Sequence, residues 1–327
     1  MLSAVQNSIK PQLTTEEIQG LVRRGLGTPV DVVETVEFTD GFFSAAFGLR
    51  LGDGRELVLK VAPPRELKLM RYEFELMRTE IHFYERAGAA GVPLPGLRFA
   101  DPDAGVLLID RLRGRTLASV KQEIPTADLI ELRREIGRCA AAITAISGPL
   151  FGYPRLDGRT RSTSWRESFL AIVDDVLTDA VELDAELPAP ADQIAVAVRR
   201  HADLLDEVTT PALLHYDLWD GNIFVVEEGG RWRIEAIIDG ERAFYGDPIA
   251  ELVSAIAFID EEQGAAVIDG MLGRPLTTDE QTRLRLYTAY LFLILVTEGK
   301  TRGFDPAEHE PVRQWALGYL KTLLASL

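Results

Sequence analysis

The stretch "LLHYDLWDGNIFVV", residues 213–226, places one histidine, two aspartates and one asparagine between two apolar runs. A strand, a tight turn and a second strand would bury the apolar ends and bring the polar middle to one point in space. Further along the chain, the apolar strand of "AIIDGE" ends at Asp239. We therefore expect Asp217, Asn222 and Asp239 to converge at the ends of adjacent short strands.

These three oxygen-bearing side chains suit a hard divalent cation. Mg²⁺ prefers oxygen ligands and commonly uses one or two protein groups together with substrate phosphates. Asp239 and the amide oxygen of Asn222 fit that role, which leaves Asp217 to accept a proton from a hydroxyl group or to align it for attack. Taken alone, each residue is more often structural, and only their combination indicates a catalytic site.

Three motifs in order give this combination its specificity. "HYDLWDGN" (215–222) followed by "IIDGE" (237–241) resembles the catalytic loop and the metal-binding Asp of the protein-kinase-like fold. The pair is most similar to the aminoglycoside phosphotransferase and fructosamine kinase group, whose loop runs H-G-D-x-x-x-x-N. "GDPIAELV" (246–253) resembles the GDP-x-x-D-L-A segment of the same group.

The resemblance implies a role for each residue of the loop. Asp217 would be the catalytic Asp, and Asn222 and Asp239 would be the metal ligands. His215 would be structural and would brace the loop. Tyr216 stands where the group has Gly, and Glu251 replaces the Asp of the later segment, but neither change removes a ligand.

A lobe that holds a nucleotide should supply a strand lysine and a helix glutamate. "ELVLKV" (56–61) places Lys60 among apolar residues, where exposure on an edge strand is the alternative explanation for the charge. In the next helix, Glu80 matches the family's placement ahead of its "GVPVP"-like turn. Glu73 is the second candidate, because it lies two helical turns earlier on nearly the same face.

The other nucleotide contacts follow from the order of the motifs. "FTDGFFSAAF" has one glycine, Gly41, in place of the kinase G-x-G-x-x-G, and Ser44 stands where the phosphotransferase group often has Asn. We expect this loop to offer backbone amides and the Ser44 hydroxyl to phosphate. In the interlobe segment "LLIDRLRG", backbone groups of Asp110 to Leu112 would meet a purine edge. The alternative interpretation is a strand and a linker that bind no ligand.

The predicted elements indicate an α+β, bilobal, protein-kinase-like fold. A small β-rich lobe with one long helix precedes a larger helical lobe that carries the catalytic loop and the acceptor site. We expect a leading helical segment over 1–30 within a nucleotide-binding lobe over 1–110, a hinge over 111–114 and the helical lobe over 115–327. Helices are predicted over 14–26, 66–88, 126–147, 164–183 and 191–208.

Composition and charge narrow the classes of function. With 46% hydrophobic and 26% charged residues, the chain of 327 residues is typical of a globular protein. Its longest apolar run, "AYLFLILV", is far shorter than the ~20 residues of a membrane span, and its first residues lack the apolar core of a signal peptide. The single Cys139 excludes an intrachain disulfide. We expect a cytoplasmic protein without a membrane partner.

The net charge of −16 disfavours nucleic-acid binding and favours cationic small molecules. Acidic residues gather between 165 and 190 and again in "IDEE" (259–262). In the aminoglycoside kinases, acidic side chains of the helical lobe bind the ammonium groups of the drug, whereas a solvated helix face explains the same charges. Trp219 and Asp220 are the loop residues that we expect to face the acceptor.

The sequence thus predicts an enzyme that uses ATP or GTP and Mg²⁺ to phosphorylate a hydroxyl group of a small molecule. An aminoglycoside-like or other antibiotic, and hence a role in resistance, is the first interpretation. A metabolic kinase for an amino-sugar, fructosamine, choline or sugar is the alternative. A non-catalytic pseudokinase is disfavoured, because Lys60, Asp217, Asn222 and Asp239 are all present. The oligomeric state is left open.

Overall fold

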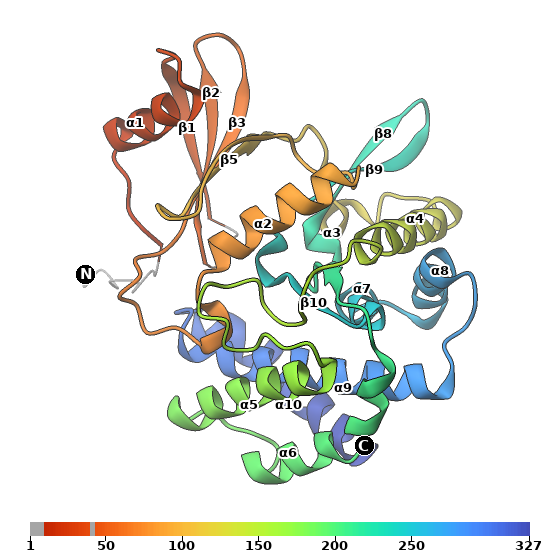
Figure 1. The fold of residues 1–327 in the computed structure, drawn as a ribbon. Helices are drawn as coiled ribbons and strands as arrows, with labels where there is room; N and C mark the ends of the chain where they lie inside the picture. Colours follow the sequence, from red (N-terminus) through yellow and green to blue (C-terminus); the bar gives the residue numbers. More distant parts are fainter. Residues whose placement is uncertain (1–9, 40–42) are drawn as a thin grey trace.

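Two lobes make up the computed structural model, which describes residues 10–39 and 43–327 (Figure 1). The smaller lobe is built on a β-sheet, and the larger lobe is mostly helical. This is the bilobal α+β arrangement that the sequence predicts. None of the helices in the described part of the chain combines the length and the hydropathy that a membrane span requires.

An antiparallel sheet of five strands forms the small lobe, in the order β1-β2-β3-β5-β4. The strands are β1 (Val32–Phe38), β2 (Ala45–Leu51), β3 (Glu56–Val61), β4 (Leu97–Asp101) and β5 (Val106–Asp110). Lys60 of β3 lies opposite Ala46 of β2 and Leu107 of β5. Because β3 is an interior strand, exposure on an edge strand does not explain this lysine.

Helix α1 (Thr15–Leu26) packs on this sheet and begins where the sequence predicts. The Thr14 side chain accepts a hydrogen bond from the Glu17 amide, and the Glu17 carboxylate accepts one from the Thr14 amide (2.7 Å). This reciprocal pair is a capping box. Ile18 and Val22, one turn apart, are buried in the same apolar cluster as β2 and β3, so the leading segment belongs to the small lobe.

Helix α2 (Leu76–Ala89) is shorter than the helix predicted over 66–88. Glu75 adopts a left-handed conformation with φ of +59°, which interrupts the helix, and a 3₁₀ turn (Arg71–Glu73) precedes it. Tyr72 in this turn is buried in the core of the helical lobe rather than against the sheet. The prediction was wrong here because apolar spacing along a segment does not reveal which lobe will bury it.

The helical lobe surrounds one long buried helix, α9, which packs against α5, α7 and α10. Its helices are α3 (Leu117–Val120), α4 (Thr126–Thr144), α5 (Trp165–Glu182), α6 (Ala191–Arg199), α7 (Leu252–Ile256), α8 (Glu261–Leu272), α9 (Thr278–Thr297) and α10 (Pro306–Ala325). Residues 289–294 of α9 are all buried, because neighbouring helices cover every side of it.

Two of these helices end before their predicted bounds. Helix α4 stops at Thr144 because the Ile146 carbonyl accepts a hydrogen bond from the Leu213 amide (2.8 Å), which ties the chain to the next strand. Helix α6 stops at Arg199 and gives way to a 3₁₀ turn (Ala202–Glu207), which directs Leu205 into the core. In both cases a tertiary contact, rather than a local stop signal, ends the helix.

Two small sheets are inserted among these helices. Their strands are β6 (Arg115–Thr116), β7 (Ala212–Leu214), β8 (Ile223–Glu228), β9 (Arg231–Ile237) and β10 (Phe244–Gly246). One sheet has the order β6-β8-β9, and the other is the antiparallel pair of β7 and β10. The segment between β7 and β8 is the polar stretch that the sequence singles out.

Candidate active site

The two small sheets bring the predicted loop residues together. Strand β7 leads directly into His215, β8 begins directly after Asn222, and β9 runs toward Asp239. The Ile238 amide donates a hydrogen bond to the Asn222 carbonyl (2.9 Å), so the end of β9 is held against the start of β8. Asp217, Asn222 and Asp239 therefore lie at neighbouring strand ends, as expected.

His215 braces the loop from inside the protein. Its Nε2 atom lies 2.9 Å from the Ile238 carbonyl oxygen, and its Nδ1 atom accepts a hydrogen bond from the Asp217 amide (3.2 Å). Its ring packs edge-to-face on Phe83 of α2, with centroids 5.0 Å apart. Burial lowers the pKa of His215 to about 4, so the ring is neutral at pH 7 and its role is structural.

Tyr216 and Glu251 are the two departures from the family pattern, and each has a function in the loop. Tyr216 has a φ of +60°, a region that favours glycine, and its hydroxyl donates to the Tyr287 carbonyl (2.7 Å). The Glu251 carboxylate accepts hydrogen bonds from the amides of His215 (2.8 Å) and Tyr216 (3.2 Å). These contacts hold the backbone that presents the next residue, the catalytic candidate.

Asp217 is held by an asparagine and an arginine. The Asn222 amide nitrogen donates to the Asp217 carbonyl (2.8 Å) and carboxylate (3.0 Å). The Arg242 guanidinium lies 4.0 Å from the same carboxylate and also bonds Glu298 (3.0 Å). Burial raises the pKa of Asp217, and Arg242 opposes this effect. Sequence reasoning missed Arg242, although a charge between the apolar runs of "IIDGERAFYGDP" was a usable signal.

Lys60 is fixed by carboxylates from two other elements. Its ammonium nitrogen lies 2.6 Å and 2.8 Å from the two oxygens of Glu80 on α2, and 2.6 Å from Asp239. Burial alone would lower the pKa of Lys60, but Asp239 and Glu80 raise it, so the lysine is charged. Glu80, rather than the second candidate Glu73, is therefore its helix partner, and Glu73 instead pairs with Arg302 (2.6 Å).

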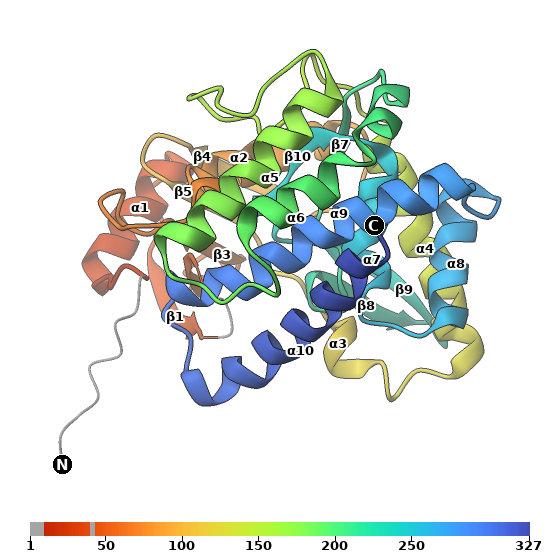
Figure 2. The ribbon, with the colours of Figure 1, turned by 90° about the horizontal axis from the view of Figure 1, so that it is seen from below.

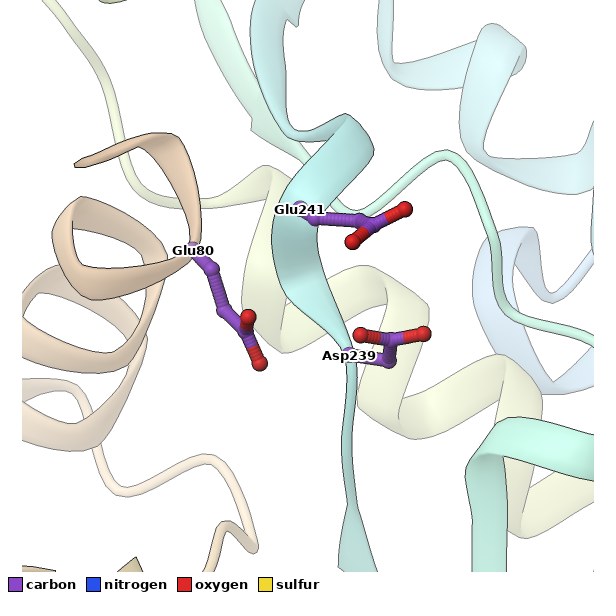
Figure 3. Close-up of side chains that lie close together, drawn as sticks. All are labelled: Glu80, Asp239 and Glu241. Carbon is purple, nitrogen blue, oxygen red and sulfur yellow. The ribbon is translucent and has the colours of Figure 1, made fainter. Parts of the chain in front are cut away.

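The carboxylates around this lysine fit a divalent cation. Glu80, Asp239 and Glu241 each place an oxygen within 4.8 Å of the others (Figure 3). Burial and, to a smaller extent, Asp239 raise the pKa of Glu241 to about 8, and Arg302 and Lys60 oppose this effect. Asn222 uses its amide nitrogen for Asp217, which leaves the amide oxygen for a metal. Glu241 is a further carboxylate of the site that the sequence prediction did not include.

The other residues predicted to contact the nucleotide lie near the start of β2 and the end of β5. Gly41 lies outside the described residues. Ser44 is buried directly before β2, and Leu112 follows the end of β5. Two guanidinium nitrogens of Arg98 donate hydrogen bonds to the Asp110 carboxylate (2.6 Å and 2.7 Å). The Asp110 amide donates a hydrogen bond to the Gly96 carbonyl (2.9 Å). A base contact at Asp110 would therefore have to use its carbonyl.

Asp220 does not face an acceptor, contrary to expectation. Its carboxylate is buried and is bound by Arg133 (3.0 Å) and Lys121 (3.1 Å). These cations come from α4 and from the residue after α3, so Asp220 fastens the loop to those helices. Trp219 remains 42% exposed and can meet a ligand.

The acidic residues of α5 and the turn after it are mostly paired with arginines. The ion pairs are Asp174–Arg199, Asp175–Arg159, Asp179–Arg71, Glu182–Arg71 and Glu186–Arg313. The sequence left two explanations for these charges, drug binding and a solvated helix face. Asp174, Glu182 and Glu186 are about half exposed within these pairs, as a solvated helix face would have them.

Comparison with known proteins gives one family and one fold. The model of the phosphotransferase enzyme family matches residues 35–287. A solved fructosamine-3-kinase-like structure from Thermobifida fusca YX-ER1 is 20% identical, with a TM-score of 0.67, 96% of this chain covered and 100% of that one. No curated protein matches.

Two further solved structures share the fold. An aminoglycoside phosphotransferase APH(4)-Ia in complex with ADP and hygromycin B is 17% identical, with a TM-score of 0.62 and 94% of this chain and 98% of that one covered. A choline/ethanolamine kinase family protein from Mesorhizobium loti is 18% identical, with a TM-score of 0.60 and 95% of each chain covered. The fold is thus shared by kinases of chemically different small molecules.

Proposed function

Because the chain belongs to the phosphotransferase enzyme family, we propose that it transfers the γ-phosphoryl group of ATP or GTP to a hydroxyl group of a small molecule. The observation that carries this proposal is the assembly of Asp217 and Asn222 from one loop, Asp239 from the end of β9 and Lys60 from β3 into one site. Such a site promotes phosphoryl transfer mainly by positioning and by charge stabilisation.

Each residue has a defined task in this proposal. Asp217 accepts or aligns the proton of the attacking hydroxyl, and the Asn222 amide keeps its carboxylate in place. Glu80 orients the Lys60 ammonium, which neutralises the donor phosphates. Asn222 and Asp239 would hold magnesium, which when bound screens the negative charge on those phosphates.

The donor lies between the lobes in this proposal. The loop with Gly41 and Ser44 contacts the phosphates, and the backbone from Asp110 to Leu112 contacts the base. The presence of ADP in a solved relative of the same fold supports a nucleotide donor. The expected cytoplasmic setting is part of the same proposal, because nucleoside triphosphates and reduced cysteine both belong to that compartment.

Two classes of acceptor remain in the proposal, an antibiotic and a metabolite. Relatives of this fold include a complex with hygromycin B and a fructosamine-3-kinase-like protein. The half-exposed carboxylates of α5 and the turn after it, which are paired with arginines at the surface, do not distinguish the two classes. A pseudokinase stays disfavoured, because the catalytic set is complete.

Substitution of the proposed base tests the function. Purified protein is incubated with Mg²⁺, ATP or GTP and a panel of antibiotics, sugars and amino alcohols, and phosphorylated product is measured. We expect Asp217→Ala to lower kcat by at least about a hundredfold while nucleotide binding persists. Asp203→Ala, which removes an exposed aspartate in the turn after α6, is the matched control. Full turnover by Asp217→Ala would contradict the proposal.

A further inference from the structure

One arginine of the site, Arg242, is buried with part of its hydrogen-bonding capacity unused. It ends the 3₁₀ turn (Gly240–Arg242) that directly follows Asp239, and it is 6% exposed. Its Nη2 atom donates a hydrogen bond to Glu298 (3.0 Å), whereas its Nε atom has no hydrogen-bond partner within the described part of the chain. Because a buried N–H group that lacks a partner costs free energy, the free Nε of Arg242 indicates a task beyond the pair with Glu298.

The free Nε atom faces the proposed base. It lies 4.0 Å from Oδ2 of Asp217, which is too long for a hydrogen bond but short enough for attraction between opposite charges. The same Oδ2 accepts a hydrogen bond from the Asn222 amide nitrogen (3.0 Å). Oδ1 accepts no hydrogen bond from any residue that the structure describes, and the Asp217 side chain is 19% exposed. Oδ1 is therefore the oxygen that is open to a ligand.

The need to balance Glu298 does not by itself account for Arg242. Glu298 also accepts a hydrogen bond from the Tyr72 hydroxyl (3.1 Å) and lies 3.5 Å from Arg302, so its charge has other partners. Asp217 has no second cation within ion-pair distance among residues 10–39 and 43–327. Loss of Arg242 would thus leave Glu298 paired and Asp217 without a countercharge.

Glu298 holds the arginine from a firmly packed position. It directly follows α9, which lies between α5 and α10 when the molecule is seen from below (Figure 2). The Tyr72 hydroxyl that binds Glu298 comes from the 3₁₀ turn before α2, and the Tyr72 ring centroid lies 5.8 Å from the Arg242 guanidinium carbon. Arg242 is therefore held both by the end of α9 and by the segment that leads into α2.

We propose that Arg242 is a positioning residue for Asp217 and that Glu298 keeps it in place. Arg242 and Asn222 fix Oδ2, so that Oδ1 faces the acceptor hydroxyl. Oδ1 accepts the hydroxyl proton while the hydroxyl oxygen forms a bond to the γ-phosphorus. The bond from this phosphorus to the bridging oxygen breaks, and that oxygen keeps the electron pair on the nucleoside diphosphate. The inference rests on the proposed function, because the task of Arg242 belongs to that transfer.

Kinetics of Arg242 variants test this role. Transfer from ATP or GTP with Mg²⁺ is measured to hygromycin B, fructoselysine, choline and water, and the acceptor that the wild type uses fastest is kept for all variants. Arg242→Gln should lower kcat about ten- to a hundredfold, with the KM for the nucleotide changed by less than about twofold, because a misplaced reacting group costs rate rather than donor binding. Arg242→Lys, which retains the charge, should recover much of the loss.

A double-variant cycle separates positioning from a general structural role. In Asp217→Asn, which lacks the charge that Arg242 attracts, Arg242→Gln should lower the residual kcat by no more than about a further twofold. An arginine that is merely structural would lower kcat by the same factor in both backgrounds. Arg233→Gln, which removes an exposed arginine paired with Glu228 on the neighbouring strand (3.5 Å), is the matched control and should leave kcat unchanged.

Thermal unfolding applies the same comparison without catalysis. Arg242→Gln should lower the Tm more in the wild type than in Asp217→Asn, because only the wild type keeps a buried carboxylate that loses its countercharge. Glu298→Gln should lower kcat in the same direction as Arg242→Gln but less, because the arginine then loses a support and remains present.

The outcomes separate this inference from the proposed function. Equal factors of kcat loss in the two backgrounds, or a wild-type kcat in Arg242→Gln, would overturn the role of Arg242, while transfer that requires Asp217 would keep the proposed function. If no acceptor, water included, receives the phosphoryl group, the proposed function fails. Equal losses of Tm in the two backgrounds would then show that Arg242 does not act on Asp217 either.

Discussion

Tyr216 shows how a non-glycine residue can occupy a left-handed backbone position in the loop. A non-glycine residue in a strained backbone region costs about 1–3 kcal/mol. Its buried ring packs against Phe244, with centroids 4.9 Å apart, and its hydroxyl is bonded to the Tyr287 carbonyl. These contacts, together with the hydrogen bonds that the His215 and Tyr216 amides donate to the Glu251 carboxylate, offset the backbone strain at Tyr216.

His215 should make stability depend on pH in a predictable direction. Its pKa is about 4 in the folded protein, against an ordinary value of 6.5, so the unfolded chain binds a proton more readily between these values. The contribution is complete above pH 6.5 and is lost as the pH falls toward 4. Urea unfolding of wild type and His215→Asn should show their difference in unfolding free energy decrease by roughly 2 kcal/mol from pH 7 to pH 5.

A matched variant makes this measurement specific to the loop. His201→Asn, at the end of α6, removes an imidazole outside the catalytic loop. If the difference between wild type and His215→Asn stays constant over this pH range, His215 is not the buried neutral group that its contacts indicate.

Residue identities were predictable where a local pattern carried them. Lys60 between apolar neighbours and the Asp–Asn spacing of the loop follow from short stretches of sequence. The direction of the Asp220 side chain and the partner of Glu73 could not be predicted in this way, because they depend on arginines that are distant in the chain, Arg133 and Arg302. From the sequence, an acidic residue that binds a ligand cannot be distinguished from one that forms an ion pair with a distant arginine.

At the scale of elements, the largest difference between the predicted and the observed structure is the segment before α2. The 3₁₀ turn (Arg71–Glu73) lies in sequence within the small lobe, yet its side chains bind the helical lobe. Arg71 pairs with Asp179 and Glu182 of α5, and Glu73 pairs with Arg302 after α9. This turn therefore fastens the base of α2, the helix that carries Glu80, to the helical lobe.

Loss of the Glu73 charge should weaken this connection. Glu73 is 1% exposed and accepts hydrogen bonds from Arg302 (2.6 Å) and from the Met70 amide (2.9 Å). Glu73→Gln leaves a buried arginine with less countercharge, so we expect a loss of about 2–4 kcal/mol in unfolding free energy. Glu85→Gln, the same change at an exposed position of α2, should have almost no effect in the same urea titration. Equal effects of the two variants would show that the buried pair does not stabilise the fold.

At the scale of the whole molecule, Lys60 and Asp239 join the two lobes at the place where a nucleotide would bind. A ligand that binds the folded state and not the unfolded chain stabilises the fold by RT ln(1 + [L]/Kd), which is about 2.7 kcal/mol at a concentration one hundred times its Kd. We therefore expect ATP or GTP with Mg²⁺ to raise the Tm by several degrees in a thermal unfolding assay.

The magnesium dependence of this shift tests the metal ligands. A chelator should remove most of the increase, and Asp239→Asn should lose the same part even when Mg²⁺ is present. Asp203→Asn is the control for removal of an exposed carboxylate. A shift in Tm that is as large with chelator as with Mg²⁺ would contradict the assignment of Asp239 as a metal ligand.

The sequence by itself determined the two lobes, their order and the positions of the candidate site residues, because strand alternation, capping signals and motif spacing are local properties of the chain. Only the tertiary structure decided that Glu80 is the partner of Lys60, that Asp220 is held by Lys121 and Arg133, and that arginines pair with the α5 carboxylates. These outcomes depend on which remote side chains meet when the helices pack. Charge pairing and surface exposure are set by that packing, and the residue types alone leave them undetermined.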